Sequence, residues 1–134
     1  MHVNPTAVTE LHQGPLAEQL GIRFVEASRD RVVAELAFRD TLTTVGGSLH
    51  GGTLRAVADT VGAAATMLNL PAGASTITIE SKTNFLVGVR AGTVRAETTP
   101  LHHGRRTMVW QPRVTDEKGR LLSLTVQTQM GLES

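Results

Sequence analysis

Residues 51–68 constrain the fold of this chain more than any other segment, because they have the pattern of a helix built almost entirely from small and apolar residues. Such a helix can be buried almost all round, and its alanines and glycines let another backbone come close. The chain has 134 residues, which is the length of one domain. We therefore expect a single domain, residues 1–134, in which a sheet surrounds one helix and a second subunit completes the burial.

Asp59 lies inside this helix and is the only charged residue between Arg55 and Glu80. An ionised carboxylate in apolar surroundings is costly unless it is paired, hydrated or protonated. It is also one of the few side chains that can act as a general base or a nucleophile. The isolation of Asp59 therefore favours a catalytic role. The alternative is a structural carboxylate that accepts hydrogen bonds from backbone N–H groups or from Thr60 and Thr66.

Short elements are predicted before the long helix. The Gly-Pro pair at 14–15 and the glycine at 21 predict a helix over residues 15–20. Strands follow over residues 22–27 and 32–38. A flexible, glycine-rich loop at 45–52 then leads into the long helix, which ends near residue 70, before Pro71.

Four strands are predicted after the helix, over residues 75–85, 93–101, 107–115 and 121–130, with a hairpin turn at 116–119. They alternate in polarity, which predicts one buried face and one wetter face. Ile77 and Ile79 share a face in the first of these strands. The two faces of the last strand are Leu122, Leu124, Val126, Thr128 and Ser123, Thr125, Gln127, Gln129. One central helix and an antiparallel meander predict an α+β fold in which the sheet wraps the helix.

The composition argues against several classes of function. The formal net charge is +1 and aromatic residues make up 3% of the chain, which does not suit a nucleic-acid-binding surface. The chain has no cysteine, which excludes a disulfide framework, a thiolate zinc site and a cysteine nucleophile. No third ligand is placed with His102 and His103 in the sequence, so no metal site is expected.

The sequence also gives an expectation of location. No apolar run reaches the roughly 20 residues needed to span a bilayer. Residues 1–6 lack both the basic start and the apolar stretch of a signal peptide. We therefore expect a cytoplasmic protein, with neither a membrane nor a nucleic acid as partner.

His50, Gly51 and Gly52 stand directly before the helix. Two glycines at a helix start leave backbone N–H groups unobstructed at the positive end of the dipole, which suits an oxyanion or another anion. The alternative is that they serve only close packing. Asp59 is eight residues beyond Gly51, or about 12 Å along a helix. The two cannot act on one carbonyl within a chain, so the spacing predicts an active site shared across a symmetric dimer.

Residues 47–52, Gly-Ser-Leu-His-Gly-Gly, followed by Ala58 and Asp59, look like the signature of the hotdog-fold acyl-CoA thioesterases. The chain is most similar to the phenylacetate-degradation type, the PaaI-like group. The resemblance continues through residues 76–85, 90–92 and 103–106, and it covers most of the chain from about Leu20 onward.

The resemblance implies a hotdog fold, in which a long helix is wrapped by an antiparallel sheet, and an assembly into dimers and commonly tetramers. Asp59 would be the catalytic carboxylate, as general base on water or as nucleophile. The Gly51 N–H would polarise the thioester carbonyl from the partner chain. Thr78 would help to position water or substrate, and His50 would sit beside the reacting carbonyl or hold the loop.

The resemblance also implies contacts with coenzyme A. Its phosphates would lie near the subunit surface, with Arg90, Arg105 and Arg106 as candidate contacts, and Gly52 is a further candidate for substrate binding. One position departs from the family pattern. Family members often have Asn or Gln six residues before the histidine, where this chain has Thr44, whose hydroxyl donates a hydrogen bond over a shorter reach than an amide.

The function predicted from the sequence is hydrolysis of an acyl-CoA thioester to free acid and coenzyme A, with no cofactor. One alternative is hydration or dehydration of an acyl-CoA on the same fold, and another is an acyl-CoA-binding domain without catalysis. The acyl group, aryl or medium-chain, is left open. The sequence also leaves open a homodimer or a homotetramer, and a general base or a nucleophile.

Overall fold

The computed structural model describes residue 11 and residues 14–133 of the chain. Residues 1–6, for which the sequence predicts no signal peptide, lie outside this range. The elements are α2 (Gly14–Leu20), β1 (Arg23–Ala27), β2 (Val32–Ala37), the 3-10 helix η1 (Asp40–Leu42), α3 (Gly51–Met67), β3 (Ser75–Phe85), β4 (Thr93–Thr98), β5 (Pro100–His103), β6 (Thr107–Trp110), β7 (Arg113–Thr115) and β8 (Leu121–Leu132). In the described part of the chain no helix is long and apolar enough to cross a membrane.

All the strand pairs are antiparallel and belong to one sheet. The strand order is β1-β2-β4-β7-β8-β6-β5, and β3 pairs with β8. Both β7 and β6 pair with β8, one after the other along its length. β3 covers the opposite side of β8 and has no other partner strand in the described chain. One long edge of the sheet is therefore β3.

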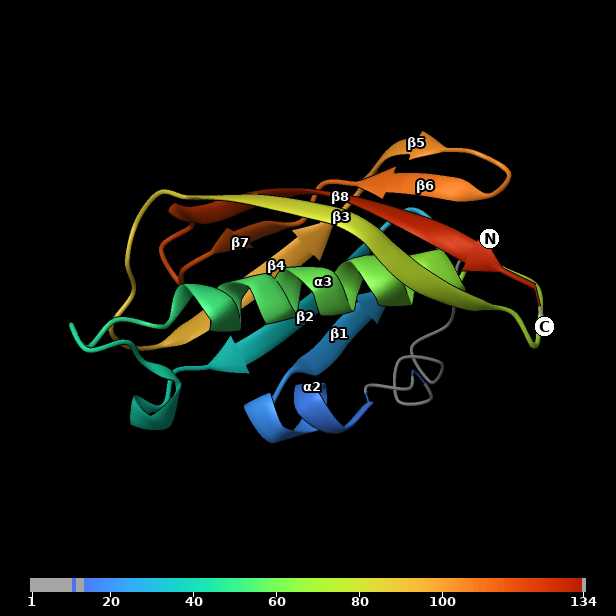
Figure 1. The fold of residues 1–134 in the computed structure, drawn as a ribbon. Coiled ribbons are helices and arrows are strands. Elements are labelled where there is room, and N and C mark those ends of the chain that lie inside the picture. Colours follow the sequence, from blue (N-terminus) through green and yellow to red (C-terminus); the bar gives the residue numbers. More distant parts are fainter. Residues whose placement is uncertain (1–10, 12–13, 134) are drawn as a thin grey trace.

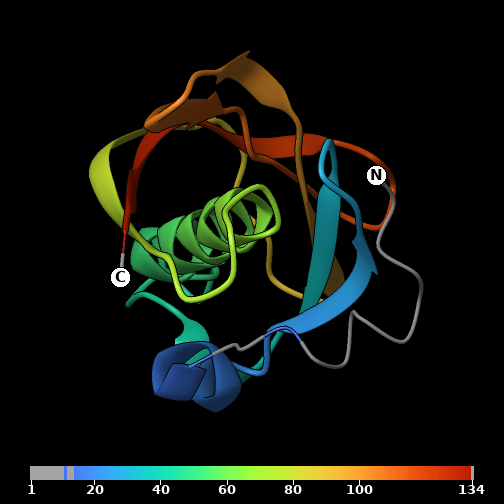
Figure 2. The ribbon, with the colours of Figure 1, turned by 90° about the vertical axis from the view of Figure 1, so that its right-hand side faces the viewer.

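The sheet curves around α3, which lies across its concave face (Figures 1 and 2). The helix packs on β2, β3, β4 and β8, and α2 lies against its other side. Val57, Val61 and Ala65 of the helix are fully buried, as is Trp110 beneath it. This arrangement confirms the predicted α+β class, with one helix wrapped by an antiparallel sheet.

The two middle strands of the predicted meander are each divided in two. Residues 93–101 form β4 and β5, and residues 107–115 form β6 and β7. The second division falls at Gln111 and Pro112, and a proline has no N–H to give to a ladder. Alternate residues keep a common face across the division, since Met108, Trp110 and Val114 are all buried.

The last strand buries its polar face over most of its length. Thr125, Gln127 and Gln129 are fully buried under α3, whereas Val126 is 39% exposed. The apolar member of an alternating pattern is expected to face the core, and beyond Leu122 that expectation is wrong here. The reason is that these polar side chains hydrogen-bond to polar side chains of β3 and α3.

β3 is exposed along most of its length. Ile77 and Ile79 are 47% and 55% exposed, so the face that they mark in the sequence is not the buried one. The pairing register with β8 shifts between Thr78 and Glu80, which makes a β-bulge at Ile79. A bulge re-aims the side chains on either side of it. Thr78 points to α3 before the bulge, and Ser81 and Thr83 continue the inner face after it.

One face of α3 is left incompletely covered. Thr60, Ala63 and Ala64 are half-buried, and Met67 is 42% exposed. The predicted burial all round the helix is therefore not reached by one chain. The open face of the helix and the free edge of β3 are two surfaces that the described residues leave uncovered.

The turn between β7 and β8 is anchored by the Asp116 carboxylate. Its Oδ1 accepts hydrogen bonds from the backbone N–H groups of Lys118 and Arg120, and its Oδ2 accepts one from Arg120 Nε, each at 2.9 Å. The side-chain hydrogen bond from Arg120 contributes most to lowering the pKa of Asp116 below its usual value, and the Arg120 backbone N–H adds to it.

A carboxyl group with a lowered pKa in the folded state stabilises that state above the pKa of the unfolded chain. This contribution is lost as the pH falls through the folded pKa. We therefore expect Asp116→Ala to lower Tm most near neutral pH and least in acid, as measured by thermal unfolding across a pH series. Lys118→Ala, in the same turn, is the control and should show no such trend. An equal Tm loss for Asp116→Ala at every pH would contradict this role.

Candidate active site

The Asp59 side chain is held by one of its two oxygens. Oδ1 accepts a hydrogen bond from Thr78 Oγ1 at 2.6 Å and another from Gln127 Nε2 at 2.9 Å. Oδ2 accepts none from the described part of the chain. Helix α3 thus supplies the carboxylate, and the two neighbouring strands β3 and β8 supply its donors. The geometry leaves one carboxylate oxygen with both its lone pairs unused.

The network continues beyond the first donors. Gln129 Nε2 donates to Thr78 Oγ1 at 2.6 Å, and Thr76 Oγ1 lies 2.9 Å from Gln129 Oε1. The site residues predicted from the sequence do not include Gln127 or Gln129. The signal that could have found them is two amides spaced by two in a predicted strand, which places both on one face of that strand.

The start of α3 is capped by His50. Its Nδ1 accepts a hydrogen bond from the Gly52 N–H at 2.7 Å. The N–H of Gly51 has no acceptor in the described residues. Of the two glycines, Gly51 therefore has the backbone donor available to a substrate oxygen, while that of Gly52 is already engaged.

Thr44 and Arg90 lie at the same end of α3 as Gly51. Arg90 Nη1 donates to Gly46 O at 2.6 Å, and the Thr44 N–H donates to Ser48 O at 2.9 Å in the loop that leads to the helix. The structure therefore separates these two residues from Asp59 within one chain. They group instead with Gly51.

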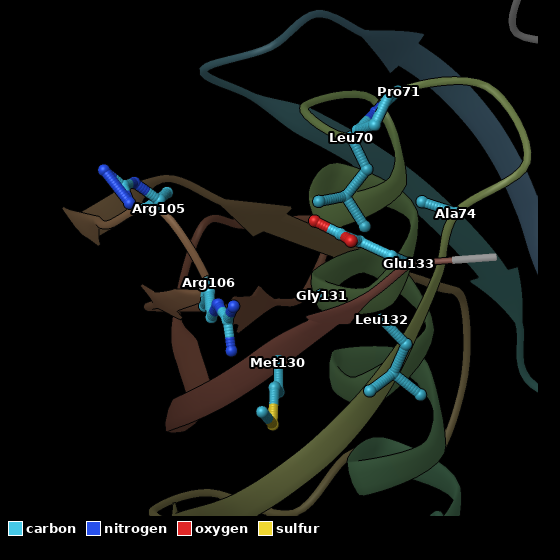
Figure 3. A pocket seen from close by; sticks show the side chains of 9 residues that line it. All are labelled: Leu70, Pro71, Ala74, Arg105, Arg106, Met130, Gly131, Leu132 and Glu133. Atoms are coloured by element: carbon cyan, nitrogen blue, oxygen red, sulfur yellow. The ribbon is translucent and has the colours of Figure 1, made fainter.

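Arg105 and Arg106 lie beyond the opposite end of the helix. They border a cavity of about 250 Å³ between the β5–β6 turn, the segment after α3 and the end of β8 (Figure 3). Neither forms an ion pair within the described chain. Leu70, Pro71 and Met130 make the cavity partly apolar, and Glu133 also lines it. The structure thus brings Arg105 and Arg106 together, but not with Arg90.

Two cavities are lined by Asp59. The larger, about 730 Å³, lies between α2, α3 and the start of β3, and Asp59 is the only charged residue in its described lining. Leu16, Ala63, Met67 and Leu68 give it apolar walls. The smaller, about 300 Å³, is lined by Gly52, Arg55, Ala56, Asp59, Thr78 and Ser81. The carboxylate therefore lies between an apolar compartment and a polar one.

Arg55 lines the polar compartment, although it is not among the site residues predicted from the sequence. It precedes Asp59 by one helical turn, and its Nη2 donates to Ser81 O at 3.0 Å. Its spacing of four from both Gly51 and Asp59 is the signal that could have found it, since residues i and i+4 share a helix face.

In the described part of the chain, no three His, Asp or Glu side chains gather as metal ligands would.

Comparison with known proteins identifies the family. Residues 46–123 match the thioesterase superfamily, and this match spans more than half of the chain. The chain belongs to the thioesterase superfamily. It is a thioester hydrolase with the hotdog fold, and the resemblance seen in the sequence is confirmed.

Relatives and solved structures agree with this membership. The 1,4-dihydroxy-2-naphthoyl-CoA hydrolase of Escherichia coli is 32% identical over 115 residues, which is 86% of this chain and 85% of that protein. A thioesterase from Haemophilus influenzae superposes with a TM-score of 0.90 at 27% identity, over 99% of this chain and 93% of the other. The E. coli PaaI protein shares the fold, with a TM-score of 0.84 at 23% identity over 98% and 94% of the two chains.

The cap at the start of α3 gives a stability prediction. His50→Ala leaves the Gly52 N–H without its acceptor, and we expect the free energy of unfolding to fall by about 1 kcal/mol. His50→Asn keeps a capping side chain and should retain most of the stability. Urea unfolding of the three proteins measures the difference. Identical midpoints would show that the imidazole does not act as a cap.

Proposed function

We propose that this protein hydrolyses acyl-CoA thioesters, with Asp59 as the catalytic carboxylate. The observation that carries the proposal is the carboxylate held by Oδ1 between an apolar and a polar cavity, with Oδ2 left for chemistry. A thioester has an apolar acyl part and a polar coenzyme A part joined at the reacting carbon, so the two compartments suit its two halves. Because coenzyme A thioesters are intracellular, the proposal includes a cytoplasmic location.

The large cavity would take the acyl group. Its volume of about 730 Å³ falls within the usual range for small-molecule sites, about 300–1,000 Å³. Asp59 is the only charge in its described lining, and this carboxylate would repel an acidic acyl group. The substrate acyl group is therefore neutral, either aryl or medium-chain aliphatic.

The proposed reaction begins when Asp59 Oδ2 takes a proton from water while the water oxygen attacks the thioester carbonyl carbon. The carbonyl oxygen becomes an oxyanion, to which a backbone N–H donates. The oxyanion then collapses, the C–S bond breaks, and the proton goes to the departing coenzyme A sulfur. A direct attack by Oδ2 on the carbonyl carbon would instead break the C–S bond, release the coenzyme A thiolate and form a mixed anhydride, which water hydrolyses in a second step to the free acid and the Asp59 carboxylate.

The oxyanion donor would come from a second copy of the chain. Gly51 and Asp59 lie on one helix, about 12 Å apart along its axis. A two-fold axis midway between them would place each Gly51 against the partner's Asp59 and would lie beside Arg55. The free edge of β3 and the open face of α3 are available for this pairing. A dimer is therefore the smallest active unit that we propose.

The same arrangement supports a site for coenzyme A phosphates. An antiparallel pair of helices would bring the Gly51 end of one subunit, with its Arg90, toward the far end of the other, where Arg105 and Arg106 lie. Arginines suit phosphate because their N–H groups form bidentate, charge-assisted hydrogen bonds. Thr44, on the Gly51 side, would then face the partner's Asp59.

The central prediction concerns Asp59→Asn. The amide has the same size but cannot accept the proton, so we expect kcat to fall by about 100-fold or more with the fold retained. Thiol release from a panel of aryl and aliphatic acyl-CoAs measures turnover, and circular dichroism monitors the fold. Asp116→Asn, a carboxylate in a distant turn, is the matched control and should turn over like the wild type. Wild-type rates in Asp59→Asn would remove Asp59 from the mechanism.

Mixed dimers test the shared site. Gly51→Pro removes the N–H at the first helical position, where proline is tolerated, and Gly51→Ala adds a similar Cβ beside Phe85 but keeps the N–H. We expect Asp59→Asn and Gly51→Pro each to be inactive, and their mixed dimer to regain about half of the wild-type activity because one of its two sites is intact.

The Gly51→Ala variant separates the loss of the N–H from the contact with Phe85, whose ring would lie 3.2 Å from the new Cβ. Activity in Gly51→Ala together with inactivity in Gly51→Pro assigns the effect to the N–H. A mixed dimer that is as inactive as its parents would place each active site within one chain.

A further inference from the structure

Gln127 and Gln129 are two fully buried amides on the face of β8 that packs against α3. Glutamine is seldom fully buried, and an apolar residue could fill either position without a polar group to satisfy. Both amides connect to Asp59: Gln127 directly, and Gln129 through the Thr78 hydroxyl. Their presence therefore calls for a reason other than packing.

The orientation of the Gln127 amide is set by Asp59. An ionised carboxylate only accepts hydrogen bonds, so Nε2 must face it. This orientation leaves Gln127 Oε1 buried, and it accepts no hydrogen bond from the described residues. A buried acceptor without a donor destabilises the fold. The Gln127 side chain thus combines a favourable donor to Asp59, Nε2, with a buried acceptor, Oε1, that destabilises the fold.

Helix α3 is adapted to this amide at Gly62. A Cβ at position 62 would lie 2.6 Å from Gln127 Nε2, a distance that real side chains do not adopt. Glycine in the middle of a helix is itself destabilising. The helix therefore has a glycine, the residue with the lowest helix propensity after proline, at the point where the Gln127 amide reaches Asp59.

The direction of the Thr78 hydroxyl follows from Gln129. Thr76 Oγ1 lies within hydrogen-bond distance of Gln129 Oε1, and Gln129 Nε2 donates to Thr78 Oγ1. Thr78 has one hydroxyl proton, and with its oxygen accepting from Gln129 that proton goes to Asp59 Oδ1. The Thr78 hydroxyl therefore acts as a hydrogen-bond donor to the Asp59 carboxylate.

We propose that Gln127 and Gln129 are positioning residues that hold Asp59 by Oδ1 and so present Oδ2 to the reacting water or thioester. The proposal rests on the proposed function of Asp59. Two fixed donors on one oxygen orient the other. A misplacement of about 1 Å at a catalytic group can lower the rate by about 100-fold.

The test is Gln127→Met, which conserves volume and removes both the donor to Asp59 and the unsatisfied carbonyl oxygen. We expect kcat to fall by about 10-fold to 100-fold with KM unchanged, while the urea midpoint stays level or rises. Thr125→Val is the matched control, because Thr125 is buried on the same face of β8 and bonds Thr83 instead. It should lower the urea midpoint and leave kcat unchanged.

A second variant, on helix α3, displaces the same Gln127 amide. Gly62→Ala improves helix propensity, but its Cβ displaces the Gln127 amide, so kcat should fall without loss of helix content. In the Asp59→Asn background, Gln127→Met should lower the rate no further, because the group that it positions is already gone. Wild-type kcat in Gln127→Met, or a rate loss no greater than that of Thr125→Val, would overturn the proposal.

A spectroscopic measurement separates this inference from the proposed function. The side-chain NH₂ resonances of Gln127, assigned by their loss in Gln127→Met, should shift clearly in Asp59→Asn whether or not any thioester is hydrolysed. If the wild type hydrolyses no acyl-CoA, the proposed function fails while the NMR result still decides the positioning of the carboxylate. Unchanged Gln127 resonances in Asp59→Asn would overturn the positioning role.

Discussion

The contact between β8 and α3 determines both the packing and the chemistry of this protein. At this contact Gln127 lies against Gly62 and donates to Asp59, so the carboxylate is joined to the sheet that wraps it. A carboxylate on a helix face open to solvent could turn through several rotamers. Here Thr78 and Gln127 converge on one of its oxygens, and the other oxygen accepts no hydrogen bond from the described residues.

The incompleteness of the single chain is the second constraint. Asp59 and the unengaged N–H of Gly51 lie at different points along one rigid helix, and no local rearrangement of that helix can bring them together. The described residues also leave the edge of β3 without a partner strand and one face of α3 half-covered. One dimer would resolve all three features, which is why we treat assembly and catalysis as one proposal.

Much of the fold could be predicted from the sequence, because the signals there are local. The long helix ends at Met67, a few residues earlier than the end near residue 70 that Pro71 predicts, and alternation marks the strands even where Pro112 divides one of them. The error in β8 has a physical cause. Alternation shows that a strand has two faces, but it identifies the inner face only if the core is apolar throughout. Around Asp59 the core is polar, and Gln127 and Gln129 lie inside while Val126 lies outside.

The sequence by itself determined most of the elements, their class and the position of one isolated carboxylate, because propensity, glycine and proline placement and charge act over a few residues. Tertiary structure alone decided what that carboxylate contacts. The bulge after Thr78 and the approach of β8 to Gly62 depend on segments about 20 to 70 residues away from Asp59 along the chain. Hydrogen bonds between segments so far apart leave no periodic trace in the sequence, since they arise only when the sheet closes around the helix.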